Sequence, residues 1–133
     1  MADIDKGIES AMPAAVIAGV VGGLIMEFFR PTGLSGITGA LASLPRGMFI
    51  WLGVAAGFIF GTIFGALYAV FYERLPAKTD TKKAIIFWAA LWAIFAAVPF
   101  VVATTAGVQV PVGWIVGTLA ASLICGALTA VFW

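Results

Sequence analysis

The residue best placed for proton chemistry is Glu27, an ionisable side chain near the end of a long apolar segment. An acidic group inside a membrane is costly to bury, so it marks either a functional site or an ion pair. Arg30 follows three residues later, a spacing that puts both side chains on one face of a helix. Glu27 and Arg30 are therefore predicted to form a charge pair, with proton or cation handling by Glu27 as the alternative.

Other reactive side chains are scarce. The sequence has no histidine and one cysteine, Cys125, which leaves too few ligands for a zinc or iron–sulfur site. It also lacks a Ser–His–Asp set, a Cys–His set and a phosphate-binding loop. We therefore expect no catalytic site, no metal and no cofactor, although the chain could be a subunit of a membrane enzyme complex.

The composition identifies the environment of these residues. Of the 133 residues, 63% are hydrophobic and 10% charged, with a formal net charge of +1. A soluble domain has about 25% charged residues, and a chain this apolar cannot cover its surface with polar groups. A soluble globular domain and a disordered chain are excluded, and no basic patch indicates nucleic-acid binding. The chain is predicted to be an integral membrane protein.

Four apolar segments are long enough to span a bilayer as helices. Ser10 is a plausible N-cap for the first, Pro13 would lie in its first turn, and Pro99 is expected to kink the third. The prediction is an all-α, four-helix bundle forming a single transmembrane domain over residues 1–133. Its predicted spans are about 11–29, 48–72, 84–105 and 113–133.

A shorter helix is predicted between the first two spans. Leu34, Ile37, Leu41 and Leu44 recur at helical spacing in an uncharged linker. Eleven residues are too few to cross the bilayer. Residues 34–44 are therefore predicted to form an interfacial or re-entrant helix.

Small residues recur at every fourth position within the spans. Lipid provides no hydrophobic drive for helix association, so such stripes stabilise contacts by letting two backbones approach closely. We predict a compact bundle packed through glycine and alanine, with contacts within the chain or between chains. The predicted packing residues are Gly19, Gly23, Gly53, Gly57, Gly61, Gly65, Gly113 and Gly117.

Bulky side chains occupy the other faces. The second span carries a ridge that should meet lipid or a partner: Phe58, Ile59, Phe60, Ile63 and Phe64. The tryptophans are predicted to form interfacial belts near the span ends: Trp51, Trp88, Trp92, Trp114 and Trp133. Thr118, Ser122 and Thr129 are a weak indication of a polar lining for a small solute.

Basic residues predict the orientation. One side of a four-span protein would hold Lys6, Arg74, Lys78, Lys82 and Lys83, and the other only Arg30 and Arg46. By the positive-inside rule, both termini and the loop at 73–83 are expected in the cytoplasm, in the inner (cell) membrane.

Three functions are compatible with these features. The first is a non-catalytic membrane subunit, or an assembly or stabilising factor, of a larger complex. The second is a small homo-oligomeric channel or proton-coupled transporter that uses Glu27. The third is a helical bundle that binds a lipid, quinone or pigment. The expected partners are membrane lipid and other integral membrane subunits or further copies of the chain, without nucleic acid.

Overall fold

The computed structural model describes residues 3–29, 40, 43–108 and 110–133, which are all-α. Within them, four helical segments are long and apolar enough to cross a membrane, as predicted. The first two are α1 (Ile4–Phe28) and α3 (Met48–Phe71), the latter continued by the short helix η1 (Tyr72–Arg74). The helix predicted over 34–44 falls mostly outside the described residues.

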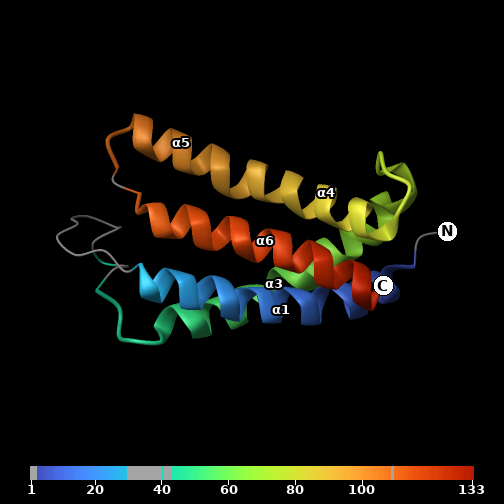
Figure 1. The fold of residues 1–133 in the computed structure, drawn as a ribbon, viewed down its shortest axis with the longest axis horizontal. Helices are drawn as coiled ribbons and strands as arrows, with labels where there is room; N and C mark the ends of the chain where they lie inside the picture. Colours follow the sequence, from blue (N-terminus) through green and yellow to red (C-terminus); the bar gives the residue numbers. More distant parts are fainter. Residues whose placement is uncertain (1–2, 30–39, 41–42, 109) are drawn as a thin grey trace.

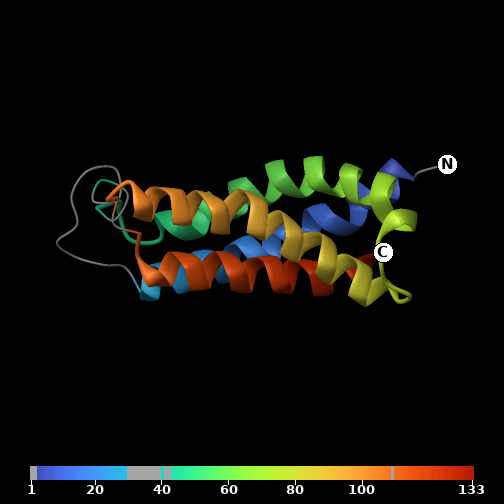
Figure 2. The same ribbon diagram turned by 90° about the horizontal axis from the view of Figure 1, so that it is seen from above.

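The third segment consists of α4 (Asp80–Trp92), η2 (Ala93–Ala97) and α5 (Val98–Thr105), and the fourth is α6 (Val112–Phe132). Helix α1 packs against both α3 and α6, and α4 packs against α6. Figures 1 and 2 show successive segments running in opposite directions, with both termini and the turn between η1 and α4 at one end.

The start of α1 differs from the prediction. The helix begins at Ile4, and the Asp3 carboxylate caps it by accepting a hydrogen bond from the Lys6 N–H at 3.0 Å. Ser10 is therefore inside the helix, buried, and donates its hydroxyl to the Gly7 carbonyl. Pro13 also lies inside the helix. The Asp3 cap lies two turns before Ser10, so the helix includes a polar stretch that hydropathy alone would leave out of the span.

The contact between α1 and α3 is made almost entirely of small residues in antiparallel register. A Cβ atom on Gly57 would lie 2.6 Å from the Ala15 carbonyl oxygen, and one on Gly23 would lie 2.6 Å from that of Phe49. Each four-residue step along α1 meets a four-residue step along α3 in the opposite direction. The facing positions are Gly7 with Gly65, Ala11 with Gly61, Ala15 with Gly57, Gly19 with Gly53, and Gly23 with Phe49.

Helix α6 uses its own small residues against two neighbours. A Cβ atom on Gly117 would lie 3.1 Å from the Gly22 carbonyl oxygen of α1, and Gly113 contacts Phe29. Further along, a Cβ atom on Gly126 would lie 2.9 Å from the Ile85 Cα atom of α4. The small faces of α6 therefore bring α1 and α4 close on either side of it.

The third span is interrupted just before Pro99. Its π-helical turn η2 is defined by a hydrogen bond from the Val98 N–H to the Ala93 carbonyl, five residues back. The usual α-helical donor to the Ile94 carbonyl is the Val98 N–H, which bonds to Ala93 instead, and Pro99 has no N–H to take its place. Beyond this point α5 makes few close contacts with the other described helices. The second half of the third span therefore diverges from the bundle.

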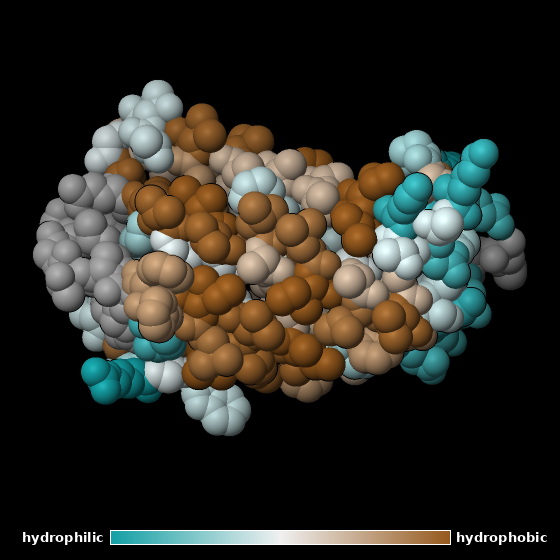
Figure 3. All heavy atoms as spheres, in the orientation of Figure 1, coloured by the Kyte–Doolittle hydropathy of each residue, from teal (hydrophilic) through white to brown (hydrophobic). Residues whose placement is uncertain are grey.

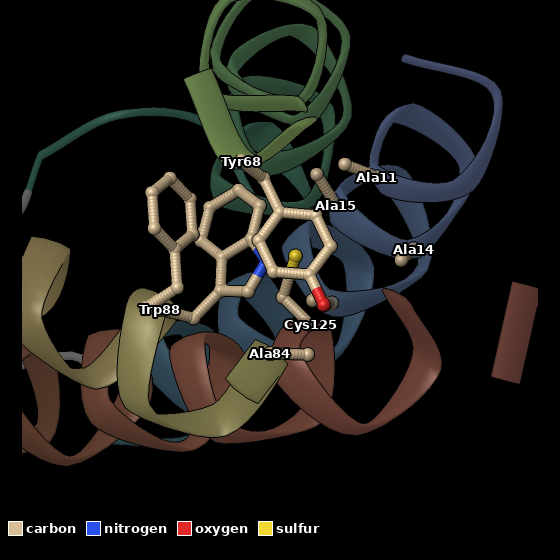
Figure 4. Close-up of a cluster of buried hydrophobic side chains, with 9 residues drawn as sticks. Ala11, Ala14, Ala15, Tyr68, Ala84, Trp88 and Cys125 are labelled. Atoms are coloured by element: carbon tan, nitrogen blue, oxygen red, sulfur yellow. The ribbon is translucent and has the colours of Figure 1, made fainter. Parts of the chain in front are cut away.

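The core lies where α1, α3, α4 and α6 meet, and small residues dominate it. Figure 4 shows the Tyr68 ring entering this space beside Trp88, with alanines of α1 and Cys125 of α6 around it. The buried members are Ala11, Ala14, Ala15, Ala18, Tyr68, Ala84, Phe87, Trp88 and Cys125. Large rings fill only the volume that the alanines leave.

The outer surface is apolar across its middle. Figure 3 shows a broad hydrophobic area across the middle of the face in view, with most hydrophilic residues at the end that holds both termini. Four members of the predicted α3 ridge lie on this surface, namely Phe58, Ile59, Phe60 and Ile63. Phe64 does not follow them, because its ring packs edge-on against Trp88 with centroids 6.0 Å apart.

Candidate functional site

An apolar cavity of about 620 Å³ lies between α3, the third span and α6. Small residues of α1 form its floor, and aromatic side chains form its walls. The floor includes Ala15, Ala18, Gly19, Gly22 and Gly23. The aromatic walls are Phe49, Phe60, Phe64, Trp88, Trp92, Phe95, Phe100 and Trp114.

The cavity exists because α3 and α4 meet through rings instead of through their backbones. The Phe64 ring lies 6.0 Å from Trp88 and 5.5 Å from Phe95, measured between ring centroids, and Tyr68 lies 5.2 Å from Phe87. These contacts hold the two helices apart. Beyond Phe95, α5 makes few close contacts with the other described helices, and its Phe100 lines the cavity.

One stripe of α6 places side chains with polar atoms along the cavity. Trp114, Thr118 and Ser122 are spaced four residues apart and all line it. Thr118 is already engaged, because its Oγ1 accepts a hydrogen bond from Trp92 Nε1 at 3.0 Å and donates to the Trp114 carbonyl at 2.8 Å. This hydroxyl therefore ties α4 to α6 at the cavity wall.

The remaining polar groups of the stripe lack protein partners within the described residues. Trp114 is 8% exposed, and its Nε1–H is buried without an acceptor. Its indole packs edge-on against Phe49, with centroids 5.9 Å apart. The Ser122 hydroxyl makes no hydrogen bond to another residue of the described ranges. The cavity lining is thus almost wholly apolar, and the Trp114 Nε1–H has no surface exposed to it.

The interfacial belt predicted for the tryptophans is wrong for two of them. Trp88 and Trp114 are buried in the bundle, at 6% and 8% exposure. Trp88 Nε1 donates to the Thr129 hydroxyl of α6 at 3.1 Å, which satisfies its N–H away from water. Trp51, at 72% exposure, lies on the surface. Proximity to a span end did not distinguish an inward from an outward indole.

Glu27 occupies a structural position at the other end of α1. One of its carboxylate oxygens accepts hydrogen bonds from the Gly47 N–H at 3.0 Å and the Phe49 N–H at 3.3 Å. Those amides begin α3, where the helix dipole favours a negative charge. Gly47 itself is in the left-handed conformation and has no side chain to cap the helix. Glu27 therefore caps a neighbouring helix, whereas its predicted partner Arg30 lies outside the described residues.

Tyr68 provides a test of the buried core. Its side chain is 0% exposed, and its hydroxyl has no hydrogen-bond partner in the described structure. We expect Tyr68→Phe to leave the free energy of unfolding unchanged or raise it by about 1 kcal/mol, because it removes only a desolvated hydroxyl. Unfolding by sodium dodecyl sulfate in mixed micelles measures this. A loss of more than about 1 kcal/mol would mean that the hydroxyl has an ordered partner, such as buried water.

The polar end of the bundle is held by rings and cations. Tyr72 stacks on Trp133 with centroids 4.6 Å apart, and its hydroxyl donates to the Asp80 carboxylate. Lys83 Nζ lies 4.0 Å from the Tyr72 ring centroid, and Lys6 Nζ lies 4.4 Å from that of Trp133. These contacts join α1, η1, α4 and the end of α6.

No family model matches this chain, and no curated protein or solved structure matches it. The functional argument therefore depends on the geometry of the cavity and of the helix contacts.

Proposed function

We propose that the protein is a non-catalytic integral membrane protein that binds an apolar molecule in the cavity between α3, the third span and α6. The observation that supports this proposal is the cavity itself, about 620 Å³ in volume and lined almost entirely by apolar side chains. Ligand sites typically enclose about 300–1,000 Å³, with aromatic walls and a few polar groups. Among the three functions compatible with the sequence, binding of a lipid, quinone or pigment accounts best for this volume.

Neighbouring alanines on α3 allow a matched test of the cavity. Ala56 lines it, whereas Ala55 is exposed on the outer surface. The protein is purified in mild detergent, extracted with organic solvent, and the extract analysed by mass spectrometry. We expect a stoichiometric apolar molecule from the wild type and from Ala55→Phe, and loss of most of it from Ala56→Phe, because the added ring projects into the site and obstructs the ligand.

Two results would count against the proposal. One is an extract that contains only the bulk lipids in their bulk proportions. The other is equal recovery of the bound molecule from Ala56→Phe and Ala55→Phe, with both variants folded by circular dichroism. Either result would mean that the cavity is not the binding site.

A place in a larger membrane complex is a second candidate, favoured by the third span. Val98, Val101 and Val102 of α5 are each more than half exposed, and α5 makes few close contacts with the other described helices. A partner helix would cover these side chains and the Ile94 carbonyl. Native mass measurement after gentle extraction tests this, since a pure homo-oligomer would exclude foreign subunits.

For the channel or transporter alternative, the contacts of Glu27 supply no support. A carboxylate that holds the first amides of α3 stabilises the bundle. Flux through liposomes containing Glu27→Gln is the direct measurement.

We also propose that the protein lies in the inner (cell) membrane, with both termini on the cytoplasmic side. The start of α1 and the turn between η1 and α4 lie at the same end as the termini and carry Lys6, Arg74, Lys78, Lys82 and Lys83, whereas Arg46 comes just before α3, which begins at the other end. We expect a C-terminal green fluorescent protein fusion to fluoresce in bacterial cells and a C-terminal alkaline phosphatase fusion to be inactive. Active phosphatase would reverse the orientation.

A further inference from the structure

We infer that the cavity holds one extended hydrocarbon chain of a membrane amphiphile, such as an acyl or isoprenoid lipid, whose polar group stays outside at the end of the bundle away from the termini. The inference rests on the proposed function, because it specifies the ligand of the same cavity. It arises from the length of the cavity, its place along the helices and the chemistry of its lining.

The cavity is elongated along the helices. On α1 its lining runs from Ala15 to Met26, and on α6 from Trp114 to Cys125, which is eleven residue steps on each helix. At about 1.5 Å per residue, each stretch is about 16 Å long. The hydrocarbon core of a bilayer is about 30 Å thick and contains two leaflets, so one lipid chain extends over about 15 Å. The cavity therefore has the length of a single chain in one leaflet.

The cavity also lies within one half of the bundle. Its outer end is lined by Met26, Phe49 and Trp114, each within one turn of a helix end that lies away from the termini. Its inner end is lined by Ala15 and Cys125, which lie near the middle of α1 and α6. A chain in this cavity would therefore extend from one membrane surface to about the bilayer midplane.

Packed side chains close the inner end. Tyr68, Ala84 and Thr129 are 0% exposed, and none of them lines the cavity. Figure 4 shows the Tyr68 ring beside Trp88 and Cys125, which do line it. A transmembrane helix of a partner would need a groove along the whole bundle, whereas a lipid chain ends near the bilayer midplane. The closed inner end therefore favours a chain over a helix.

The lining favours a ligand whose polar group stays outside. No charged side chain lines the cavity, and the Trp114 Nε1–H has no surface exposed to it. Thr118 is engaged by Trp92 and by its own helix. A phosphate or sugar group has more polar atoms than the single Ser122 hydroxyl could satisfy, so its transfer into the cavity would be costly.

A chain can enter the cavity from the side. Leu52, Phe60 and Phe95 line it and are between 46% and 63% exposed on the outer surface. The cavity therefore meets the lipid-facing surface between α3 and the third span. Protein interiors pack more densely than liquid hydrocarbon, so a chain gains dispersion contacts when it moves from the bilayer into the cavity.

Native mass spectrometry with a homologous series of ligands measures the length of the site. The probes are linear alkylphosphocholines, from decyl to eicosyl, present at equal mole fractions in the detergent micelles that hold the intact protein. An extended chain advances by about 1.2 Å per bond, as the protein backbone does, so about 16 Å accommodates about fourteen carbon atoms. We expect the tetradecyl compound to bind about fivefold more than the decyl compound, and longer chains to gain nothing further because their additional methylenes stay in detergent.

Adjacent positions on α6 supply a matched pair of variants. Ser122 lines the cavity, whereas Leu123 is 43% exposed on the outer surface. Ser122→Phe should obstruct the inner part and leave at most about 12 Å from Trp114, enough for about ten carbon atoms. The tetradecyl-to-decyl ratio should therefore fall to about one in Ser122→Phe and keep its wild-type value in Leu123→Phe.

The outcomes separate the inference from the function on which it rests. The wild-type profile tests the inference without any variant, since equal binding of all lengths, or binding that keeps rising beyond the tetradecyl compound, overturns it. An unchanged ratio in folded Ser122→Phe also overturns it. These results leave the proposed function intact if Ala56→Phe still loses the apolar molecule. The proposed function fails if neither the extract nor the series contains a bound molecule.

Mass spectrometry of the native extract distinguishes the two sources of the chain, because acyl and isoprenoid lipids differ in mass and fragmentation. Recovery of either supports the inference. Recovery of a rigid polycyclic molecule without a long chain contradicts it.

Discussion

Replacing Gly57 with leucine is expected to disrupt the bundle, lowering the free energy of unfolding by about 3 kcal/mol or more. A Cβ atom at Gly57 would lie 2.6 Å from the Ala15 carbonyl oxygen and 2.7 Å from the Val16 Cα atom. Both obstacles are backbone, so no side-chain rotation relieves the clash and the two helices must separate. Unfolding by sodium dodecyl sulfate in mixed micelles, followed by tryptophan fluorescence, measures the loss.

The matched control lies two residues earlier on the same helix. Ala55 is exposed on the outer face of α3, so Ala55→Leu should change stability by no more than about 0.5 kcal/mol. If Gly57→Leu and Ala55→Leu were equally mild, close contact between α1 and α3 would not be what holds this pair together. Equal and severe effects would instead indicate a second contact on the outer face.

Removing the Glu27 carboxylate is expected to destabilise the protein by about 2 kcal/mol, because the change leaves two backbone donors unpaired. Those donors are the Gly47 and Phe49 amides at the start of α3. Glu27→Ala should therefore speed hydrogen exchange at both amides as well as lower global stability. Exchange measured residue by residue distinguishes loss of the cap from a general loosening.

Two further variants sharpen this test. Glu27→Gln keeps an acceptor oxygen but loses the charge, so it should cost about half as much as Glu27→Ala. Glu73→Ala removes an exposed acid from η1 and should be nearly neutral. Unchanged protection of the Gly47 and Phe49 amides in Glu27→Ala would show that another group caps α3.

The number and type of the spans could be predicted from the sequence because hydropathy and length decide them. Four apolar segments were expected, and four are present in the described residues. Helix boundaries were less predictable where a polar turn carries the helix past the apolar segment. Asp3 is an example, since its capping carboxylate extends α1 through Lys6 and Glu9.

The interior of the bundle was harder to predict, because inward and outward aromatic residues have the same composition. Trp88 is buried, whereas Trp51 is exposed, and both lie within apolar segments. Hydroxyl groups on a neighbouring helix distinguish the inward tryptophans from the outward ones. Thr129 and Thr118 accept the N–H groups of Trp88 and Trp92, so threonines on a facing helix could have indicated inward indoles.

The cavity could not be predicted either. It depends on how far ring contacts hold α3 and α4 apart and on the direction that α5 takes after the π-helical turn. Both are properties of three-dimensional packing. Pro99 indicated an interruption of the third span, but not the space beside it.

The strict four-residue repeat along α1 and α3 leaves the alignment of this pair degenerate. A slide of α3 by one repeat would again place small residues opposite small residues over most of the contact, and only the outermost position would lose its match. The repeat therefore stabilises the contact between the two helices but does not determine their register. The Glu27 carboxylate can accept from the first amides of α3 in only one register, so this one polar contact at the end of the pair fixes the register of α3 along α1.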